Sequence, residues 1–446
     1  MHTQNHLKHG KMLIALSGGA DSVALLLMMR ERGENVQAAA HCNFGLRGTE
    51  SDRDEAFVRQ LCKEQGVRLF VRTFDTRGEA RRTGESIEMA ARRLRYAWFG
   101  DLCREHGFDC VAVAHHQDDN AETLLLNLTR GTGLRGLTGM NGSGERGENG
   151  EHCVRVVRPL LDFTRAELRS FLARKGQDFV TDSTNTDTQY KRNFVRHEVL
   201  PLLARLNPSI LRTLNDTARR LCEAEAVYDY ALAALRAKIC TPYRKGGVRI
   251  DLSALAESPS PATLLHEWLT PYGFTAAQCG DALTMRTGGI AEAGKNLLTR
   301  TTDALLVAAR PVPLAETPLP AASAQSTTLA FPAQSMALDV SNVPFTSFGA
   351  LPCEASYAAL DTDTLHGVLR VRSVREGDRF TPFGMEGSQL VSDYLTARHR
   401  SRIDKLAALA VTDDKGIVWL VGERPAARCA ATQGTRTLTM LSVHPL

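Results

Sequence analysis

The chain has 446 residues, more than one ordinary domain holds, so we expect two or three domains. Hydrophobic residues make up 43% and charged residues 23% of the chain, which excludes a largely disordered protein. The formal net charge is only +4, and residues 366–446 hold twelve Lys and Arg against eight Asp and Glu. This C-terminal basic excess suits a nucleic-acid partner, but a solvated surface is the simpler interpretation of the charge alone.

The cysteines and the N-terminus indicate where the protein works. Ten cysteines are scattered without a C-x-x-C pair, which is typical of reduced thiols in a cytoplasmic protein. The opening MHTQNHLKHG has no apolar signal-peptide core, and no apolar run approaches the ~20 residues that span a bilayer. We therefore expect a cytoplasmic protein with no membrane partner.

Residues 11–132 alternate short apolar runs with helix-period segments. This alternation predicts an α/β fold with a doubly wound, mostly parallel, Rossmann-like sheet. Such sheets bind ligands beyond the carboxyl ends of their strands. The predicted strands are 12–16, 36–40, 67–71 and 111–114, and the predicted helices are 22–32, 51–65, 85–105 and 121–130.

The alternation stops near Asn207, and we place the first domain at residues 1–207. Nearly continuous helix-period sequence from 209 to 239 predicts a helical domain over 208–310. Residues 311–359 are rich in Pro, Ala, Ser and Thr, which favours a linker or irregular connection. Residues 360–446 are expected to form a small α+β domain.

The stretch SGGADS, Ser17–Ser22, lies between the first predicted strand and helix. Backbone N–H groups in such a turn can converge on a phosphate. The loop brings no lysine but a carboxylate, Asp21, which would repel phosphates unless a divalent cation such as Mg²⁺ lies between them. Capping the following helix would explain Asp21 equally well.

A second polar stretch, residues 114–140, follows the fourth predicted strand. Asp119 and Glu122 are three residues apart at a helix start, so both can face one metal ion. The same spacing also describes a capping box. His115 and His116 precede this helix, and one of them could be a satisfied core histidine.

A third stretch, residues 181–203, places Arg192 and Arg196 four residues apart on a predicted helix. Two guanidinium groups on one side of a helix suit phosphate binding. An exposed helix with solvated arginines is the simpler alternative for these two residues considered alone.

These stretches resemble known family signatures. SGGADS matches the SGGxDS signature of the PP-loop ATP pyrophosphatases, which split ATP between its α and β phosphates. Residues 114–140 are similar to the HHxDDxAExxLxxLxRGxGxxGLxGM block of the tRNA-modifying branch of that superfamily. Residues 181–203 resemble the DxSNxDxxYxRNxxR signature of the tRNA(Ile)-lysidine synthases. The residues in register with that signature are Asp182, Asn185, Asp187, Tyr190, Arg192, Asn193 and Arg196.

Three further blocks extend the resemblance, two of them with departures. Residues 85–99 are similar to the family's ExxARxxRYxxF helix. In residues 41–58, Phe44 stands where the family has a histidine. In residues 374–395, Gln389 replaces a lysine, which weakens a phosphate contact unless nearby arginines substitute. Those arginines are Arg398, Arg400 and Arg402.

The resemblance implies an ATP-dependent carbon–nitrogen ligase that modifies tRNA. Members of the family ligate free L-lysine to C2 of the wobble cytidine of tRNA(Ile) with a CAU anticodon, through an adenylated tRNA, and release AMP and pyrophosphate. Residues 1–207 would then be the PP-loop catalytic domain. Residues 208–310 and 360–446 would bind the tRNA.

The same resemblance implies roles for individual residues. ATP would be held by the loop residues Ser17, Gly18, Gly19, Ala20, Asp21 and Ser22. Mg²⁺ would be held by Asp21 and Asp119, with Glu122 as a further ligand. Arg192 or Arg196 would offset charge at the α-phosphate. His115 would accept a proton from the lysine amine.

The sequence alone leaves two alternatives to the ligase function. A tRNA thiolase of the same superfamily would need a catalytic cysteine or a cysteine-held cluster, and the chain lacks a C-x-x-C pair. A non-catalytic tRNA-binding protein would have no need of Asp21, Asp119 and Glu122. The oligomeric state is left open, with a homodimer as one option, and the residues that bind lysine are not identified.

Overall fold

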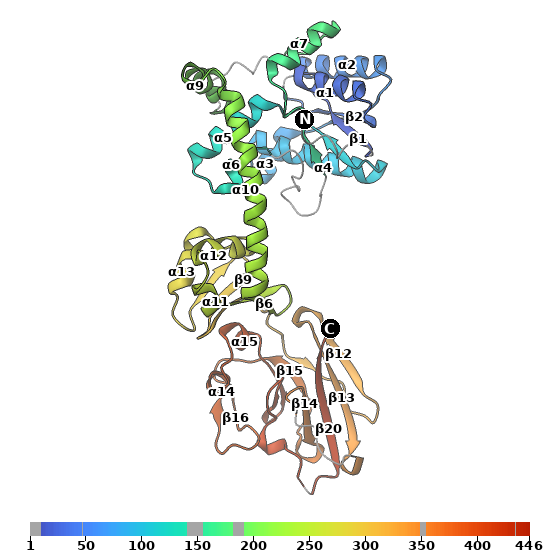
Figure 1. Ribbon diagram of the computed structural model, residues 1–446. Helices are drawn as coiled ribbons and strands as arrows, with labels where there is room; N and C mark the ends of the chain where they lie inside the picture. The colour runs from blue at the N-terminus through green and yellow to red at the C-terminus, as the bar shows by residue number, and fades with distance from the viewer. Residues whose placement is uncertain (1–9, 47, 141–154, 182–190, 348–353, 433) are drawn as a thin grey trace. The chain divides into compact units, whose positions relative to one another are not determined.

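A computed structural model describes residues 10–46, 48–140, 155–181, 191–347, 354–432 and 434–446. The chain forms two compact units, Met1–Tyr230 and Ala231–Leu446, coloured from blue to red along the chain in Figure 1. Among these described residues, no helix combines the length and apolar character needed to cross a membrane.

The first unit is built on a five-stranded parallel sheet with the strand order β3-β2-β1-β4-β5. Its strands are β1 Met12–Ala15, β2 Val36–Asn43, β3 Arg68–Thr73, β4 Cys110–Ala112 and β5 Val156–Val157. Because all strands run the same way, the loops after β1 and β4 leave the same edge of the sheet. The doubly wound parallel fold expected from the alternating pattern is confirmed.

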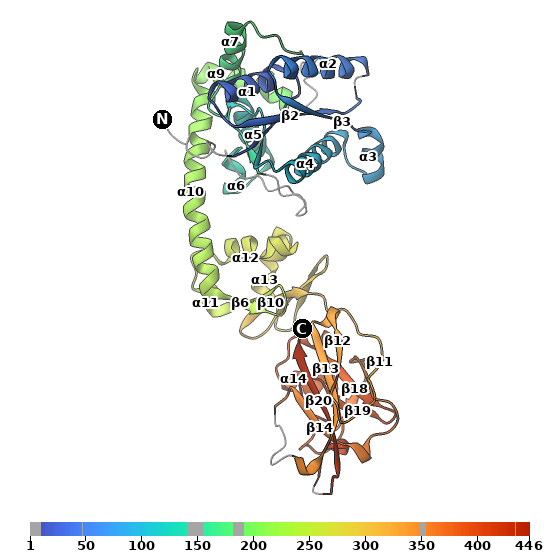
Figure 2. The ribbon, with the colours of Figure 1, turned by 90° about the vertical axis from the view of Figure 1, so that its right-hand side faces the viewer.

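Helices cover both faces of this sheet. Helices α1 (Ala20–Glu31), α2 (Thr49–Glu64) and α7 (Arg165–Lys175) supply one apolar layer, and α4 (Ile87–His106) packs on the opposite face. Figure 2 shows α1 and α2 on one side of β2 and α4 on the other. Both faces of β1 are therefore buried, which explains its uninterrupted apolar sequence.

Several helices of the first unit begin at other residues than the sequence predicts or were not predicted. Helix α5 (Gln117–Arg130) begins four residues before the predicted start. Helix α3 (Thr76–Thr83) was not predicted, because it is short and mostly polar. The remaining helices of the first unit are α6 Leu134–Leu137, α8 Lys191–Phe194, a π-helical turn Val195–Val199 and α9 Leu200–Leu206. Helix α10 (Ile210–Ile239) matches the predicted long helix.

The second unit contains a sheet that the helical periodicity did not reveal. Its antiparallel strands have the order β6-β7-β10-β9-β8. They are β6 Cys240–Tyr243, β7 Gly247–Asp251, β8 Ile290–Ala293, β9 Asn296–Arg300 and β10 Ala304–Ala309. The expected helices are α11 Leu252–Ala256, α12 Pro261–Leu269 and α13 Ala276–Thr284. Trp268 and Leu269 of α12 pack with Ile250 of β7 in one apolar core.

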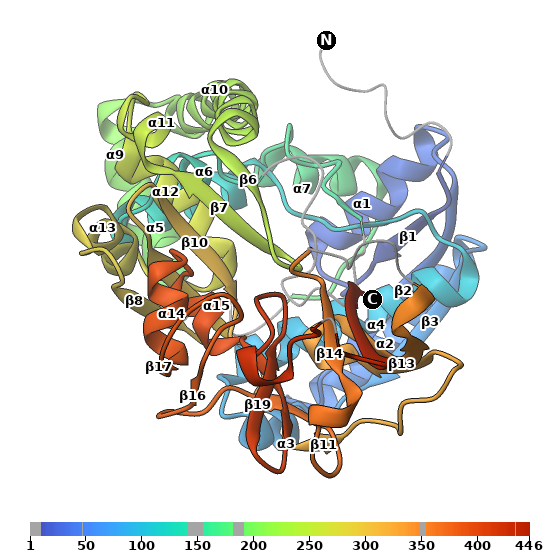
Figure 3. The same cartoon turned by 90° about the horizontal axis from the view of Figure 1, so that it is seen from below.

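The C-terminal region is α+β, as expected, and holds two four-stranded sheets of order β11-β15-β18-β19 and β12-β13-β20-β14. Their strands are β11 Thr317–Pro318, β12 Thr327–Phe331, β13 Met336–Pro344, β14 Tyr357–Asp361, β15 Arg370–Ser373, β18 Leu409–Asp413, β19 Gly416–Leu420 and β20 Thr437–Pro445. The short strands β16 Arg379–Phe380 and β17 Gln389–Leu390 pair with each other. Helices α14 (Val391–Ala397) and α15 (Arg402–Leu406) lie beside one another in Figure 3.

The expectation of a linker over 311–359 is wrong for much of that segment. Strand β13 pairs along its full length with β20, and β12 pairs with β13. Leu338 and Val340 of β13 are fully buried in the same apolar cluster as Trp419 of β19. Low charge and many small residues are typical of a linker. Here the same composition forms β13, a strand with a neighbouring strand on each side.

Within the second unit, helix α15 packs against the sheet that contains β6. Asp404 accepts hydrogen bonds from Tyr243 Oη and Arg244 Nη2, each at 2.8 Å. Ile403 is fully buried in a cluster that contains Leu297 and Leu306. This small apolar contact is therefore flanked by a charge-assisted hydrogen bond, the stronger kind of polar contact.

We expect Asp404→Asn to destabilise the second unit in a pH-dependent way. Burial raises the pKa of Asp404, but hydrogen bonds from Ser401, Arg244 and Tyr243 outweigh it and lower the pKa. A folded-state pKa below the unfolded value of about 3.9 stabilises the fold above that pH, and the contribution is lost as the pH falls through the folded-state pKa.

The variant should therefore lose about 1–3 kcal/mol of unfolding free energy near neutral pH. The deficit relative to the parent chain should shrink below a pH of about 4. Urea unfolding at both pH values measures this difference. A deficit that stays constant would contradict the role of the charged form.

Candidate active site

The SGGADS loop connects β1 to α1 at the carboxyl edge of the parallel sheet. Ser22 Oγ accepts hydrogen bonds from the backbone N–H groups of Ser17 at 3.2 Å and Gly18 at 3.1 Å, and donates one to the carbonyl of Gly19 at 2.9 Å. Val180 N–H donates to the Gly18 carbonyl at 2.9 Å. The hydroxyl of Ser22 therefore fixes the shape of the loop, and Ala20 and Asp21 begin the helix.

Gly18 is the loop position where glycine is required. Its φ of +93° lies in the region that L side chains rarely adopt, and a Cβ there would lie 3.1 Å from Val58 Cγ2. Gly19, the N-cap of α1, has an ordinary φ of −70°. A Cβ at Gly19 would meet only Ser17 Oγ, at 3.6 Å, and the Val180 carbonyl oxygen, at 4.0 Å.

His116 joins two of the three carboxylates that the sequence assigned to a metal site. Its Nε2 lies 3.4 Å from Asp21 Oδ2 and 3.4 Å from Asp119 Oδ2, and its Nδ1 lies 3.5 Å from Asp118 Oδ2. The imidazole is fully buried. Asp21, in the first turn of α1 after β1, and Asp119, in the first turn of α5 after β4, therefore meet at one nitrogen of this imidazole.

The charges of this cluster stabilise one another. Burial favours a neutral imidazole, but the carboxylates of Asp118 and Asp21 raise the pKa of His116 to about 9. Burial also opposes ionisation of Asp21, yet His116 and the charges of Arg165 and Arg169 lower the pKa of Asp21. The site is therefore a set of paired charges at neutral pH.

Glu122 has a different environment from the one expected of a metal ligand. Its carboxylate is fully buried and accepts hydrogen bonds from Arg192 Nε at 2.8 Å, Arg196 Nε at 2.6 Å and Arg196 Nη2 at 3.0 Å. Arg192 Nη2 also donates to Asp119 Oδ1 at 3.2 Å. Both oxygens of Glu122 thus position the two predicted arginines beside Asp119.

The position of Asp119 in its helix is compatible with both interpretations of this residue, helix capping and a place in the charged site. The helix begins at Gln117, so Asp119 is in its first turn and is not the N-cap. One oxygen, Oδ2, accepts a hydrogen bond from the backbone N–H of His116 at 3.2 Å. Its other oxygen faces Arg192, so the carboxylate contributes to both the helix end and the charged site.

His115 lies at the edge of this cluster. Burial lowers its pKa to about 4, and the positive charge of Arg158 acts in the same direction. Arg158 Nε donates a hydrogen bond to Nδ1 of His115 at 3.2 Å. The imidazole is therefore neutral at physiological pH, and its Nδ1 already accepts a hydrogen bond from Arg158.

The donor set fits Mg²⁺, which prefers oxygen ligands from one or two carboxylates together with phosphate oxygens. Asp21 Oδ1 is buried and has no hydrogen-bond partner among the described residues. Asp119 Oδ2 lies 3.4 Å from His116 Nε2, the same nitrogen that Asp21 contacts. No group of three or more His, Cys, Asp or Glu side chains in the described ranges forms a complete metal site. A cation here would therefore need phosphate or water oxygens as well.

Sequence reasoning missed four residues of the site. His116 was treated as a possible core residue, and Asp118, Arg158 and Arg165 were not considered. Arg165 donates its backbone N–H to Asp118 Oδ2 at 2.9 Å, and its Nη2 lies 3.5 Å from His116 Nε2. The second histidine of the HH pair was a usable signal. Arg158 and Arg165 lie over forty residues further along, and no local pattern connects them to the site.

Two details of the family resemblance concern Phe44, which departs from the family pattern, and the signature in residues 181–203. Phe44, which replaces a histidine, stacks on Phe74 with ring centroids 5.7 Å apart and lies 5.2 Å from the Arg95 guanidinium carbon. An aromatic ring therefore keeps a contact with a cation at this position. The signature residues Asp182, Asn185, Asp187 and Tyr190 lie outside the described residues.

Gly18→Ala and Gly19→Ala form a matched pair that tests the geometry of the loop. We expect Gly18→Ala to lower the unfolding free energy by about 1 kcal/mol or more, because alanine is strained at positive φ. Gly19→Ala should leave stability nearly unchanged. Chemical unfolding of both variants provides the measurement, and equal stabilities would show that the loop does not hold Gly18 in this conformation.

Comparison with known proteins agrees with this geometry. A family model described as a PP-loop domain matches residues 1–203, and one described as a TilS substrate binding domain matches residues 243–301. The tRNA(Ile)-lysidine synthase of Bacteroides thetaiotaomicron is 40% identical over 98% of this chain and 96% of its own length. That of Parabacteroides distasonis is 38% identical over 96% of this chain and 94% of its own length.

A third relative of the same name, from Porphyromonas gingivalis, is 39% identical over 92% of this chain and 89% of its own length. The resemblance inferred from the sequence motifs is therefore confirmed, and the PP-loop domain makes the chain an ATP-using enzyme. Similarity of this extent, together with the loop and charged cluster at the sheet edge, shows that the chain belongs to the tRNA(Ile)-lysidine synthase family.

Proposed function

We propose that this enzyme ligates L-lysine to C2 of the wobble cytidine of tRNA(Ile) with a CAU anticodon, and so converts cytidine to lysidine. The observation that carries the proposal is the cluster at the sheet edge. There Asp21 and Asp119 flank His116, and Glu122 holds two arginines beside Asp119. A sheet edge with these charges suits a bound polyphosphate. Membership of the family identifies the wobble cytidine as the group that ATP activates.

The reaction has two steps. The C2 oxygen of cytidine attacks the α-phosphorus of ATP, and pyrophosphate leaves. The lysine ε-amine then attacks C2, the C2–oxygen bond breaks, and AMP leaves with that oxygen while the amine loses a proton. Adenylylation is needed because the oxygen of an amide-like carbonyl is a poor leaving group.

Asp21 and Asp119 would hold Mg²⁺, which neutralises phosphate charge when it is bound. The N–H groups of Ser17 and Gly18 donate to Ser22 Oγ, so the phosphates would be oriented by the backbone N–H groups at the start of α1, where the loop Ser17–Ser22 ends. We assign Glu122 to positioning Arg192 and Arg196, in place of the metal-ligand role expected from the sequence, because its oxygens accept hydrogen bonds from both side chains.

Arg192 and Arg196 would stabilise negative charge that builds at the α-phosphate during the first step. Their guanidinium groups are already oriented by a buried carboxylate, so little reorganisation accompanies the reaction. His115 was expected to accept the proton of the lysine amine, but its Nδ1 already accepts a hydrogen bond from Arg158 Nε, so the single proton of the neutral ring is on Nε2 and this nitrogen cannot accept another. A ring with a pKa of about 4 is also a weak base, so we assign the proton of the amine to solvent and His115 Nε2–H to hydrogen-bond donation.

The tRNA would present its wobble base unstacked, since enzymes that act on a base must expose the reacting atom. The basic C-terminal region would contact phosphates. In that region Arg398 and Arg400 pair with Glu423, whereas Arg402 is exposed and can take the place of the lysine replaced by Gln389.

The cysteines favour lysine transfer over sulfur transfer. Burial raises the pKa of Cys42 and Cys103 to about 12 and that of Cys62, Cys110 and Cys240 to about 11. All eight described cysteines are free thiols. Reactive cysteines have lowered pKa values, so none of these suits a thiolase. Free thiols also agree with our proposal of a cytoplasmic enzyme.

Asp21→Asn tests the metal proposal. The substitution keeps the size of the side chain but removes a charge that we place beside the phosphates, so pyrophosphate release should fall at least about 100-fold. Glu31→Gln, at the far end of α1, is the matched control and should retain the parent rate. Near-normal release by Asp21→Asn would contradict the proposed metal site.

Product analysis tests the reaction itself. Purified tRNA(Ile) is incubated with the enzyme, ATP and isotopically labelled lysine, and the nucleosides are analysed by mass spectrometry. We expect a labelled lysidine and one AMP per modification. Sulfur incorporation from a labelled donor would favour the thiolase, and tRNA binding without AMP would favour a non-catalytic protein.

A further inference from the structure

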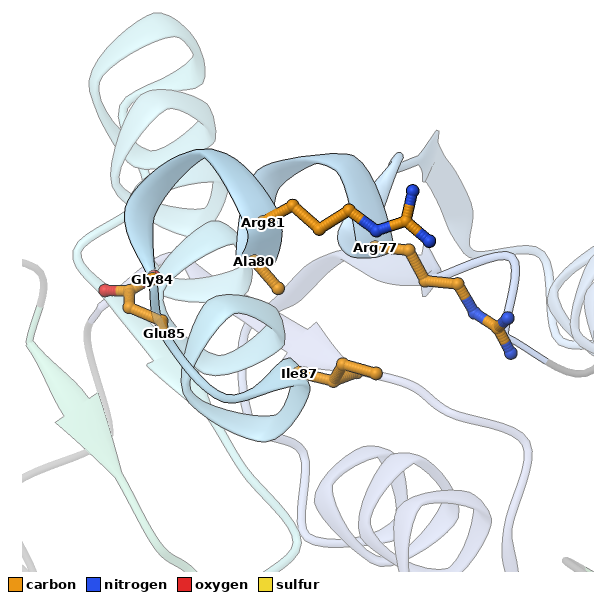
Figure 4. A pocket seen from close by; sticks show the side chains of 6 residues that line it. All are labelled: Arg77, Ala80, Arg81, Gly84, Glu85 and Ile87. Atoms are coloured by element: carbon orange, nitrogen blue, oxygen red, sulfur yellow. The ribbon is translucent and has the colours of Figure 1, made fainter.

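A hollow between α3 and α4 lies on the same edge of the sheet as the active site. Its volume is about 370 Å³, within the range of ligand pockets, and its lining residues are Arg77, Ala80, Arg81, Gly84, Glu85 and Ile87. Figure 4 shows the side chains of Arg77, Arg81 and Ile87 extending to the same side. The reaction proposed above gives this hollow no role.

The position of the hollow follows from the parallel sheet. Helix α3 begins three residues after the carboxyl end of β3, and β3 is two strands away from β1 in the sheet. Adjacent strands are about 4.8 Å apart, so this end of β3 lies roughly 10 Å from the end of β1. A polymer bound at the SGGADS loop can therefore extend over α3.

The charges around the hollow are not balanced. Glu79 pairs with Arg82 and Arg93, and Glu85 also pairs with Arg93. Arg77 and Arg81, one helical turn apart and both exposed, have no ion-pair partner among the described residues. Residues 76–93 contain five Arg against three Glu. Two guanidinium groups are thus available for an external anion.

An exposed apolar side chain, Ile87, lines the hollow together with these arginines. It is 45% exposed and is the first residue of α4. Single-stranded nucleic acid is bound by this combination, in which cations track the phosphates while unstacked bases and sugars contact apolar or planar groups. A small phosphorylated ligand would not need the exposed apolar side chain of Ile87 beside the arginines.

We propose that this hollow binds the anticodon-loop nucleotides beside the reacting base, with Arg77 and Arg81 on their phosphates and Ile87 against an unstacked base or its sugar. The proposal rests on the function proposed above and names the part of the tRNA that the α3–α4 surface holds. Binding here would keep the loop open while the wobble base enters the active site.

The test compares two double variants of the full-length enzyme. Arg77→Gln/Arg81→Gln removes the proposed contacts. Arg30→Gln/Arg174→Gln removes the same charge from the last turns of α1 and α7, at the opposite edge of the sheet. All four side chains are exposed, so stability should change little, and thermal unfolding verifies this.

For Arg77→Gln/Arg81→Gln, the Kd for tRNA(Ile) should rise about tenfold or more, and the slope of log Kd against log salt should become shallower by about 2. The kcat at saturating tRNA should stay within about twofold, because phosphate contacts position the substrate without taking part in the chemistry. The control should keep the Kd and slope of the parent enzyme. A Kd equal to that of the control would overturn the proposal.

Two further measurements locate the contact. Ile87→Gln removes apolar surface without charge, so Kd should rise several-fold with an unchanged salt slope. Hydroxyl-radical footprinting should show that Arg77→Gln/Arg81→Gln loses protection in the anticodon loop. Loss confined to the acceptor stem would overturn the proposal. If the parent enzyme forms no lysidine, the proposed function fails, whereas Kd and footprint still decide whether the hollow binds tRNA.

Discussion

The carboxylate of Glu122 is fully buried, so it can carry its charge only with cationic partners. Arg192 and Arg196 supply them, and in doing so they tie the helical segment after residue 190 to α5. Asp119, one turn before Glu122, is drawn into the same group through Arg192. Removing Glu122 would leave two guanidinium groups without their buried partner, so the geometry of the whole edge depends on this pair of contacts.

The remaining charges form a second layer around His116. Three carboxylates surround one buried imidazole, and Arg165 contacts it from α7. The SGGADS loop places an acidic side chain, Asp21, where a polyphosphate should bind, and the charges around His116 explain how this side chain is accommodated. Asp21 is held ionised by its neighbours, and one of its buried oxygens has no hydrogen-bond partner in the part of the chain that the structure describes. A cation shared with phosphate would satisfy that oxygen.

The sequence predicted those parts of the molecule that local pattern determines. Strand β1 and helix α1 followed from an apolar run and its period, whereas a shared site for Asp21 and Asp119 was implied by the family resemblance; the parallel pairing of β1 with β4 is what brings the two residues to one edge. The Glu122 contacts did not follow, because its partners lie seventy or more residues away. Strands β12 and β13 were missed because a segment of small residues becomes a strand only when β20 pairs with it.

In the mechanism that we propose, the C2 oxygen of cytidine attacks ATP at this sheet edge. It is tested most directly with tRNA(Ile) that carries ¹⁸O at C2 of the wobble cytidine, followed by mass spectrometry of the released AMP. We expect one ¹⁸O atom in the phosphate of AMP for every lysidine formed. Lysidine accompanied by unlabelled AMP would contradict it.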